Sequence, residues 1–240
     1  MTDDNSCQPG EARAGGPTVA DTLASDRHPP PPPLLESRYT FLGDEDISFT
    51  RYTSPDFFQR EVESLWPRTW QWACREEHVP DEGDTYVYDI GPYSVIVVRS
   101  ADDVIEAFIN SCTHRGTRLL ADEGSGYSPA FTCPFHGWSW ETDGSIRNIP
   151  GRWDFPHVSN ATHDLQRVLC ERWGGFVFIN MDLQAKPLAD YLDVLPEHFR
   201  HFPLERRRIK LHVQKKLPSN WKAAQEAFLE AYHNFETHDS

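Results

Sequence analysis

The chain has 240 residues, enough for one or two domains, and 38% of them are hydrophobic, which is ample for a packed core. Its formal net charge of -14 argues against nucleic acid and anionic membrane surfaces as partners, because both are themselves negatively charged. No apolar run is long enough to span a bilayer, and the acidic start, without a signal peptide, predicts a cytoplasmic protein.

Residues 1–36 are poor in large apolar side chains and rich in Pro, Gly, Ala and Asp, with an unbroken proline run from Pro29 to Pro33. Such a segment buries too little surface to offset the entropy of ordering it, and the proline run favours an extended polyproline II conformation. We therefore expect a disordered tail. A ligand for a proline-recognition domain is the alternative, although a single run indicates it only weakly.

A helix is predicted to begin at Ser54, because Ser is a good N-cap, Pro55 fits the first turn and Asp56 suits the positive end of the helix dipole. An apolar face follows and the helix should end at or near Pro67. The residues of that face are Phe57, Phe58, Val62, Leu65 and Trp66. Trp70 and Trp72 indicate that the next segment also packs.

From Gly83 onward the pattern changes to that of β-strands, with short runs rich in Val, Ile, Tyr and Phe separated by turns. Asp143-Gly144 is a strong signal for a type I′ hairpin turn. The expected strands are residues 84–90, 93–99, 104–110, a short strand ending at 132, the hairpin 137–142 and 145–149, and the pair 167–173 and 175–180. A Gly/Ser-rich connection, 124–128, lies between the third and fourth of these.

Two short loops within this β region each carry one cysteine and one histidine. Cys112 and His114 are spaced Cys-x-His, and Cys133 and His136 are spaced Cys-x-x-His. One iron of a 2Fe-2S cluster can take both thiolates and the other both imidazoles, which is the Rieske type of ligation. Loops at the tips of neighbouring hairpins could hold such a cluster from both sides.

Two other interpretations use the same four side chains. A Cys2His2 zinc site is the first, but zinc sites usually place the two cysteines together and the two histidines together. Ordinary core cysteines with hydrogen-bonded histidines are the second. The other cysteines, Cys7, Cys74 and Cys170, are interpreted as one incidental thiol in the tail and two buried apolar residues of a reduced cytoplasmic protein.

The character changes to helix at Pro187, where apolar residues repeat at helical spacing from Leu188 to Leu195. A last helix is expected after Ser219 as its N-cap, with Trp221, Ala224, Gln225, Phe228 and Tyr232 along one side. No internal repeat is visible beyond the two metal loops.

The last helix also carries ionisable residues on one stripe, Glu226, Glu230 and His233, with His238 following. Two histidines and a carboxylate indicate the facial triad of a non-haem Fe(II) oxygenase, and a solvated surface of Glu and His is the alternative. A regular helix cannot direct His233 and His238 at one metal, so we expect the helix to end or distort between Asn234 and Thr237.

Together the two motifs give the chain a specific likeness. Asn220-Trp221-Lys222 and Glu230-Ala231-Tyr232-His233, with His238, follow the blocks from Asn110 to Gly116 and from Cys133 to Trp138. In this order the motifs resemble the large (alpha) subunit of Rieske non-haem iron oxygenases, the aromatic-ring-hydroxylating dioxygenases and their monooxygenase relatives. The likeness runs from about Tyr52 to the end of the chain.

That resemblance implies roles for individual residues. Cys112 and Cys133 would hold one cluster iron, and His114 and His136 the other. His233 and His238 would be ligands of a mononuclear Fe(II), and Glu230 the acidic catalytic-site residue that links the two centres between neighbouring subunits, from His136 to His233. The family's third iron ligand is a carboxylate farther downstream, and Asp239 is not assigned to that role.

The fold implied is a mostly β Rieske iron–sulfur domain of antiparallel sheets with metal-binding hairpin loops, followed by the start of an α+β catalytic domain. The expected divisions are a tail at 1–36, an N-terminal helix plus the Rieske domain at 37–185, and the truncated beginning of the mononuclear-iron domain at 186–240.

The implied function is that of a terminal oxygenase alpha subunit. Electrons from NAD(P)H would arrive through a reductase, sometimes with a ferredoxin, and Fe(II) would activate O2 to hydroxylate a small, often aromatic, organic substrate. The full-length protein is expected to be a homotrimer or an α3β3 assembly, and a chain truncated here is expected to be inactive by itself. A Rieske electron carrier without oxygenase activity is the alternative function.

Overall fold

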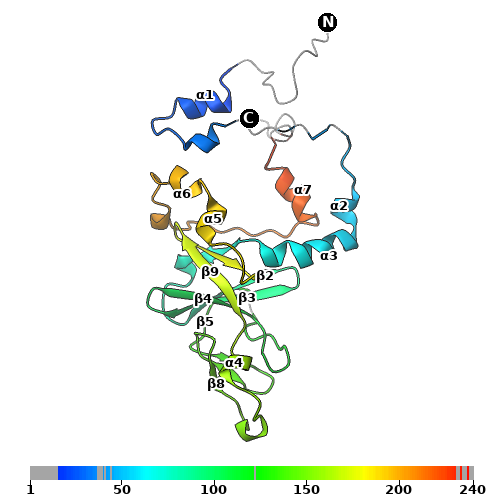
Figure 1. Cartoon of the computed structure of the whole chain (residues 1–240), viewed down its shortest axis with the longest axis vertical. Helices are drawn as coiled ribbons and strands as arrows, with labels where there is room; N and C mark the ends of the chain where they lie inside the picture. The colour runs from blue at the N-terminus through cyan, green and yellow to red at the C-terminus, as the bar shows by residue number, and fades with distance from the viewer. Residues whose placement is uncertain are drawn as a thin grey trace. The chain divides into compact units, whose positions relative to one another are not determined.

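The computed structural model describes residues 16–36, 40, 42–43, 45–121, 123–230, 233 and 237. The chain divides into two compact units, one formed by residues 1–48 and 192–203 and the other by residues 49–191 and 204–240. Figure 1 shows the order of the elements along the chain. The second unit contains the sheets and all four of the Cys and His residues predicted to hold a cluster.

The first unit contains only short helices among its described residues. They are α1 (Val19–Ala24), η1 (Pro32–Leu34) and α6 (Leu195–His198). Thr18 and Asp21 form a reciprocal capping box at the start of α1, yet α1 buries none of its residues. The prediction of a disordered tail over 1–36 stays a prediction, and Cys7 lies outside the described residues.

The second unit is built on a seven-stranded sheet in which every neighbouring pair is antiparallel, with the order β1-β10-β9-β4-β3-β2-β5. The strands are β1 (Gln71–Arg75), β2 (Asp84–Ile90), β3 (Tyr93–Ala101), β4 (Val104–Ile109), β5 (Gly124–Tyr127), β9 (Arg167–Trp173) and β10 (Phe176–Asn180). The mostly β fold is thereby confirmed. Two strands were not expected: β1, and β5, which lies in the Gly/Ser-rich connection and pairs with β2.

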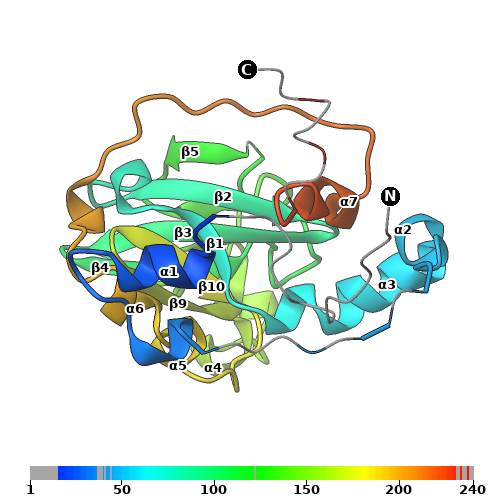
Figure 2. The same cartoon turned by 90° about the horizontal axis from the view of Figure 1, so that it is seen from above.

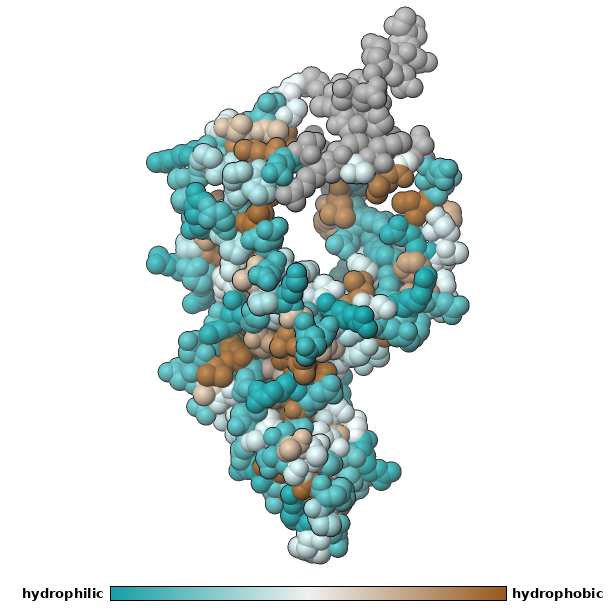
Figure 3. Space-filling view, viewed as in Figure 1, coloured by the Kyte–Doolittle hydropathy of each residue, from teal (hydrophilic) through white to brown (hydrophobic). Residues whose placement is uncertain are grey.

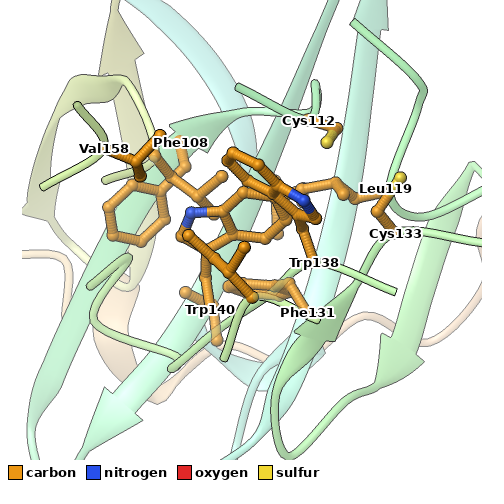
Figure 4. Close-up of a cluster of buried hydrophobic side chains, with 12 residues drawn as sticks. Phe108, Cys112, Leu119, Phe131, Cys133, Trp138, Trp140 and Val158 are labelled. Carbon is orange, nitrogen blue, oxygen red and sulfur yellow. The ribbon is translucent and has the colours of Figure 1, made fainter. Parts of the chain in front are cut away.

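Strand β3 is buried on both faces, which explains how one sheet supports two cores. Residues Val95 to Val98 are all fully buried. Because side chains alternate across a strand, Val95 and Val97 pack into one hydrophobic cluster, and Ile96 and Val98 pack into the other. The second of these clusters also contains Phe108, Phe131, Trp138, Trp140 and the two motif cysteines (Figure 4).

A three-stranded sheet of β6 (Phe131–Thr132), β7 (Ser139–Trp140) and β8 (Ile146–Asn148) lies beyond one end of the large sheet (Figure 1). The β7–β8 hairpin forms as predicted, but the prediction of a type I′ turn at its tip is wrong. Positive φ at both central residues defines that type, and Asp143 is not among the described non-glycine residues with positive φ. Instead Gly144 N–H donates to Glu141 O and Gly144 has φ 84°, which is a turn followed by a left-handed glycine.

Helices of the second unit flank the sheets (Figures 1 and 2). Those before the large sheet are α2 (Thr50–Thr53), α3 (Pro55–Ser64) and η2 (Trp66–Arg68). The remainder are η3 (Glu76–His78), η4 (Arg152–Asp154), α4 (Asn160–His163), α5 (Leu188–Leu192), η5 (Leu204–Arg206) and α7 (Trp221–Glu226). Within the described ranges, the helices are all too short or too polar to cross a membrane.

The caps of two helices can be compared with the sequence. Ser54 is the N-cap of α3 as predicted, and its side chain accepts from Phe57 N–H. The prediction that Ser219 caps the last helix is wrong. Asn220 is the N-cap of α7, because its backbone is extended and its Oδ1 reaches the N–H of Lys222 at 3.0 Å.

The turn at Gly144 generates a stability prediction. A Cβ atom added there would lie 2.4 Å from Phe108 Cε1, in a residue with φ 84°. Gly144→Ala should therefore add a packing clash of about 1–3 kcal/mol to the conformational cost of a left-handed alanine. Gly151→Ala is the matched control, since Gly151 has φ 67° with nothing within 4 Å. Urea denaturation should show the larger loss for Gly144→Ala, and equal losses would show that the Phe108 contact contributes nothing.

Candidate metal centres

The two motif loops have the same backbone geometry. In each loop the cysteine N–H donates to the carbonyl five residues later, and the cysteine carbonyl accepts from the N–H of a glycine four residues later. Both glycines have positive φ, 76° and 73°. The bonds are Cys112 N to Thr117 O, Gly116 N to Cys112 O, Cys133 N to Trp138 O and Gly137 N to Cys133 O, at 2.8, 2.8, 2.8 and 3.0 Å. Two tight loops of one shape thus present their cysteines in the same way.

The two thiols lie within interaction distance of each other and are not joined by a disulfide. Figure 4 shows both on the same side of the hydrophobic cluster. Burial raises the pKa of the Cys112 thiol. Burial also acts to raise the pKa of Cys133, but hydrogen bonds from the N–H groups of Phe135 and His136 and from the side chains of Cys112 and Thr117 together lower it. The backbone N–H groups at each cysteine favour its thiolate, the form that binds metals.

His114 occupies an aromatic enclosure. Its ring stacks on Trp138 with centroids 4.6 Å apart and planes at 6°, and the edge of Phe155 lies 5.9 Å away. Desolvation by burial, with His136 nearby, lowers the pKa of His114 and favours the neutral imidazole. Its Nδ1 is one of three buried side-chain polar atoms of the described residues that have no hydrogen-bond partner. A buried nitrogen without a partner is costly unless something binds it.

His136 is placed differently, although its ring centroid is only 4.9 Å from that of His114. His136 is exposed, and its ring stacks at 3.9 Å on Phe135, which is itself exposed. Arg115 covers the other part of this surface, with its guanidinium 5.8 Å from the Phe135 ring. One imidazole is therefore half-buried with its Nδ1 inside the protein, and the other faces the surface.

Two further residues hold the loops in place, and the sequence patterns did not single out their roles. The Asn110 side chain is buried, accepts from the N–H groups of Leu119 and Leu120, and donates to Ser94 Oγ and Leu120 O. The carbonyl of His163 accepts from Thr113 Oγ1 and from Trp140 Nε1, both at 2.9 Å. Asn110 was visible as part of the motif block, whereas a backbone carbonyl leaves no signal in a sequence.

This set of donors fits a two-metal cluster. Two cysteines whose backbone N–H groups favour the thiolate, a half-buried imidazole with a buried, unpartnered Nδ1 and an exposed second imidazole are the four ligands that Rieske ligation requires. Among the described residues, no three His, Cys, Asp or Glu side chains converge as one metal ion would require. A 2Fe-2S cluster does not need such convergence, because each iron takes two protein ligands.

The second predicted site lies at the end of the chain and is only partly described. His233 Nδ1 and Glu230 Oε1 are 2.5 Å apart, and His233 N–H donates to Glu230 Oε2 at 3.1 Å. His238, Tyr232 and Asp239 lie outside the described residues. The structure thus brings Glu230 and His233 together.

The prediction that the last helix continues to Tyr232 and His233 is wrong. Helix α7 ends at Glu226, so Glu230 and His233 follow it instead of continuing its stripe. The Glu226 carboxylate accepts from Tyr52 Oη, at 3.0 and 2.7 Å to its two oxygens. Phe228, expected on the packed side, is exposed. With Glu226 bound to Tyr52, Glu230 is the carboxylate that contacts His233.

Comparison with known proteins agrees with the geometry of the first site. Residues 69–159 match the model of the Rieske [2Fe-2S] domain. The matched segment contains the two loops, strands β1 to β8, η3 and η4, whereas β9 and β10 follow it. This part of the chain is a Rieske domain, a class of protein that carries a 2Fe-2S cluster.

Relatives extend the likeness on both sides of that domain. The carnitine monooxygenase oxygenase subunit of Escherichia coli K12 is 31% identical over 184 residues, covering 76% of this chain and 49% of that protein. The benzene 1,2-dioxygenase subunit alpha of Pseudomonas putida is 33% identical over 189 residues, covering 76% of this chain and 42% of that protein. The chain belongs to the family of Rieske oxygenase alpha subunits.

Solved structures give the same result. A quaternary ammonium Rieske monooxygenase in complex with L-carnitine superposes with a TM-score of 0.71 at 27% identity, over 78% of this chain and 53% of that chain. Naphthalene 1,2-dioxygenase from Rhodococcus sp. bound to indole gives 0.66 at 28% identity, over 77% and 44%. The chain therefore spans about half the length of the relatives that it matches.

Proposed function

We propose that this chain serves in the alpha subunit of a terminal oxygenase, where it passes electrons from a 2Fe-2S cluster to a mononuclear non-haem Fe(II). The observation that carries the proposal is the pair of matching cysteine loops, with the unpartnered Nδ1 of His114 buried between them. When bound, these groups would supply one-electron transfer and the activation of O2 for hydroxylation of an organic substrate.

The cluster would be held by Cys112 and Cys133 on one iron and by His114 and His136 on the other. Trp138 and Phe155 pack against the His114 ring, which holds that imidazole in one orientation, and its partial burial favours the neutral form. His136 presents its ring to the surface beside Phe135, where another protein or subunit can reach it. His114 would therefore hold the cluster from a half-buried position and His136 from an exposed one.

At the second site, His233 and His238 would bind Fe(II), and Glu230 would be the acidic catalytic-site residue that links the two metal centres of neighbouring subunits. Support comes from the contact of Glu230 with His233, in which one carboxylate oxygen faces Nδ1 and the other accepts the backbone N–H. A carboxylate has further lone pairs and can accept from a second imidazole N–H as well.

Partners and substrate follow from the class of the relatives. A reductase, with or without a ferredoxin, would deliver electrons from NAD(P)H, and the substrate would be a small organic molecule together with O2. The named relatives act on carnitine and on benzene, so demethylation, monohydroxylation and ring dihydroxylation all remain within the class. We further propose a cytoplasmic homotrimer or α3β3 assembly.

The cluster can be tested directly. Anaerobic reconstitution should load about two irons and two sulfides per chain, and reduction should give a rhombic EPR signal with an average g below that of all-cysteine ferredoxins. His114→Cys should lower the reduction potential, because a thiolate adds negative charge to the cluster. Purified protein that holds zinc and takes up no iron on reconstitution would contradict the proposal.

Glu230 is testable in the full-length enzyme. Glu230→Gln should leave both metal centres loaded and reduce single-turnover product formation by about 10- to 100-fold, because the amide turns an N–H toward one of its imidazole partners. Glu82→Gln, an exposed position in the turn before β2, is the control. An unchanged single-turnover rate in Glu230→Gln would refute the linking role.

The mononuclear site gives a separate prediction for the 240-residue chain. His233 and His238 would supply two imidazoles, and two imidazoles without a carboxylate would hold Fe(II) only weakly, because its charge would not be neutralised. After desalting, the chain should keep its 2Fe-2S cluster, lose mononuclear iron and form no hydroxylated product even with a competent reductase. A third iron retained stoichiometrically would show that the ligand set is complete within these residues.

A further inference from the structure

A buried ion pair joins the helix before the Rieske domain to the helix after it. Lys222 Nζ on α7 lies 2.7 Å from Glu61 Oε1 on α3, and each side chain is only 8% exposed. Trp221 Nε1 approaches the other oxygen of Glu61 at 3.4 Å. Two buried charges of opposite sign satisfy one another, whereas either alone would be strongly unfavourable.

Aromatic rings enclose the ammonium group of Lys222. Its Nζ lies 5.1 Å from the ring centroid of Phe57, 5.2 Å from that of Trp221 and 5.9 Å from that of Tyr52. Trp66 packs edge-on against Trp221 at 4.9 Å. Ring faces attract a cation that has lost its water, so this aromatic cage accommodates the lysine and excludes solvent from the pair.

Hydrogen bonds at both ends of α7 also join it to the helices before the Rieske domain. At its N-terminus, Asn220 caps the helix with Oδ1 and donates from Nδ2 to Tyr52 O at 2.9 Å. At its C-terminus, Tyr52 Oη donates to Glu226, which raises the pKa of the tyrosine. Helix α7 has only six residues. Its two ends contact Tyr52 of α2, and its first turn contacts α3 through Lys222.

We infer that Lys222 and Glu61, together with Tyr52, are positioning residues that hold α7 in one register and so fix where the chain delivers Glu230 and His233. The inference rests on the proposed function, in which those two residues serve the mononuclear iron. A helix this short is not stable by its own hydrogen bonds. The geometry of the segment that follows α7 therefore depends on the aromatic cage and the ion pair.

The experiment uses the cluster-loaded 240-residue chain and residue-resolved amide hydrogen exchange. Glu61→Gln and Lys222→Met should each lower the protection of the α7 amides by roughly a hundredfold, because each leaves one buried charge without its counter-charge. The double variant Glu61→Gln/Lys222→Met should recover most of that loss, because no charge is left buried. Losses that simply add in the double variant, or single variants with unchanged protection, would overturn the inference.

A second readout separates positioning from stability alone. The His233 amide, which donates to Glu230 Oε2, should exchange faster in Lys222→Met. It should also exchange faster in Tyr52→Phe, which keeps the ring of the cage and removes only the hydroxyl bound to Glu226. A His233 amide that does not respond in either variant would show that α7 does not control this segment, and the positioning role would be lost.

Glu63→Gln is the matched control, since Glu63 is exposed on the same helix α3, where its carboxylate accepts from the Gln59 side chain at 2.8 Å. It should change neither readout. Iron, sulfide and EPR measurements on each variant keep the two proposals apart. Failure of the wild-type chain to form a cluster counts against the proposed function, whereas normal clusters with unchanged exchange count against the positioning role.

Discussion

Two thiolates can share a small space only if their negative charge is stabilised, and around Cys112 and Cys133 the backbone N–H groups act in this direction, against the effect of burial. Each cysteine begins a tight loop whose N–H groups favour the thiolate. Such loops need a left-handed residue at one position, which Gly116 and Gly137 provide. The side chain of Asn110, the carbonyl of His163 and the hydrophobic cluster around Trp138 hold these two loops in place.

Much of this fold is predictable from sequence because alternation in strands is a strong local signal. β2 and β9 have the predicted bounds, and β3 and β4 differ from them by one or two residues. β5 was missed because Gly-Ser-Gly carries no alternation, and its strand conformation comes from pairing with β2. The turn at Asp143-Gly144 was assigned the wrong type because dipeptide preference ignores Phe108, which packs against Gly144.

The candidate sites show the same division. Cys112, His114, Cys133 and His136 were identifiable because only a few side chains bind iron, and their spacing is local. The partners that hold them were not, since the carbonyl of His163 could belong to any residue. The end of α7 at Glu226 was equally hidden, because its partner Tyr52 is 174 residues away in sequence.

The contacts of the second unit are nested in sequence, so that each pair of elements encloses the pairs formed between them. β3 pairs with its neighbours β2 and β4, β1 pairs with β10 outside them, and α3 binds α7 outside those. Glu61 and Lys222 are 161 residues apart, a separation that would make loop closure costly if the intervening chain were unfolded. Once β1 and β10 have paired, only the short flanking segments remain to be closed. The pairing of β1 with β10 thereby brings α3 and α7 close together. Most of the loop-closure entropy of the Glu61–Lys222 contact has then already been lost when the sheet forms.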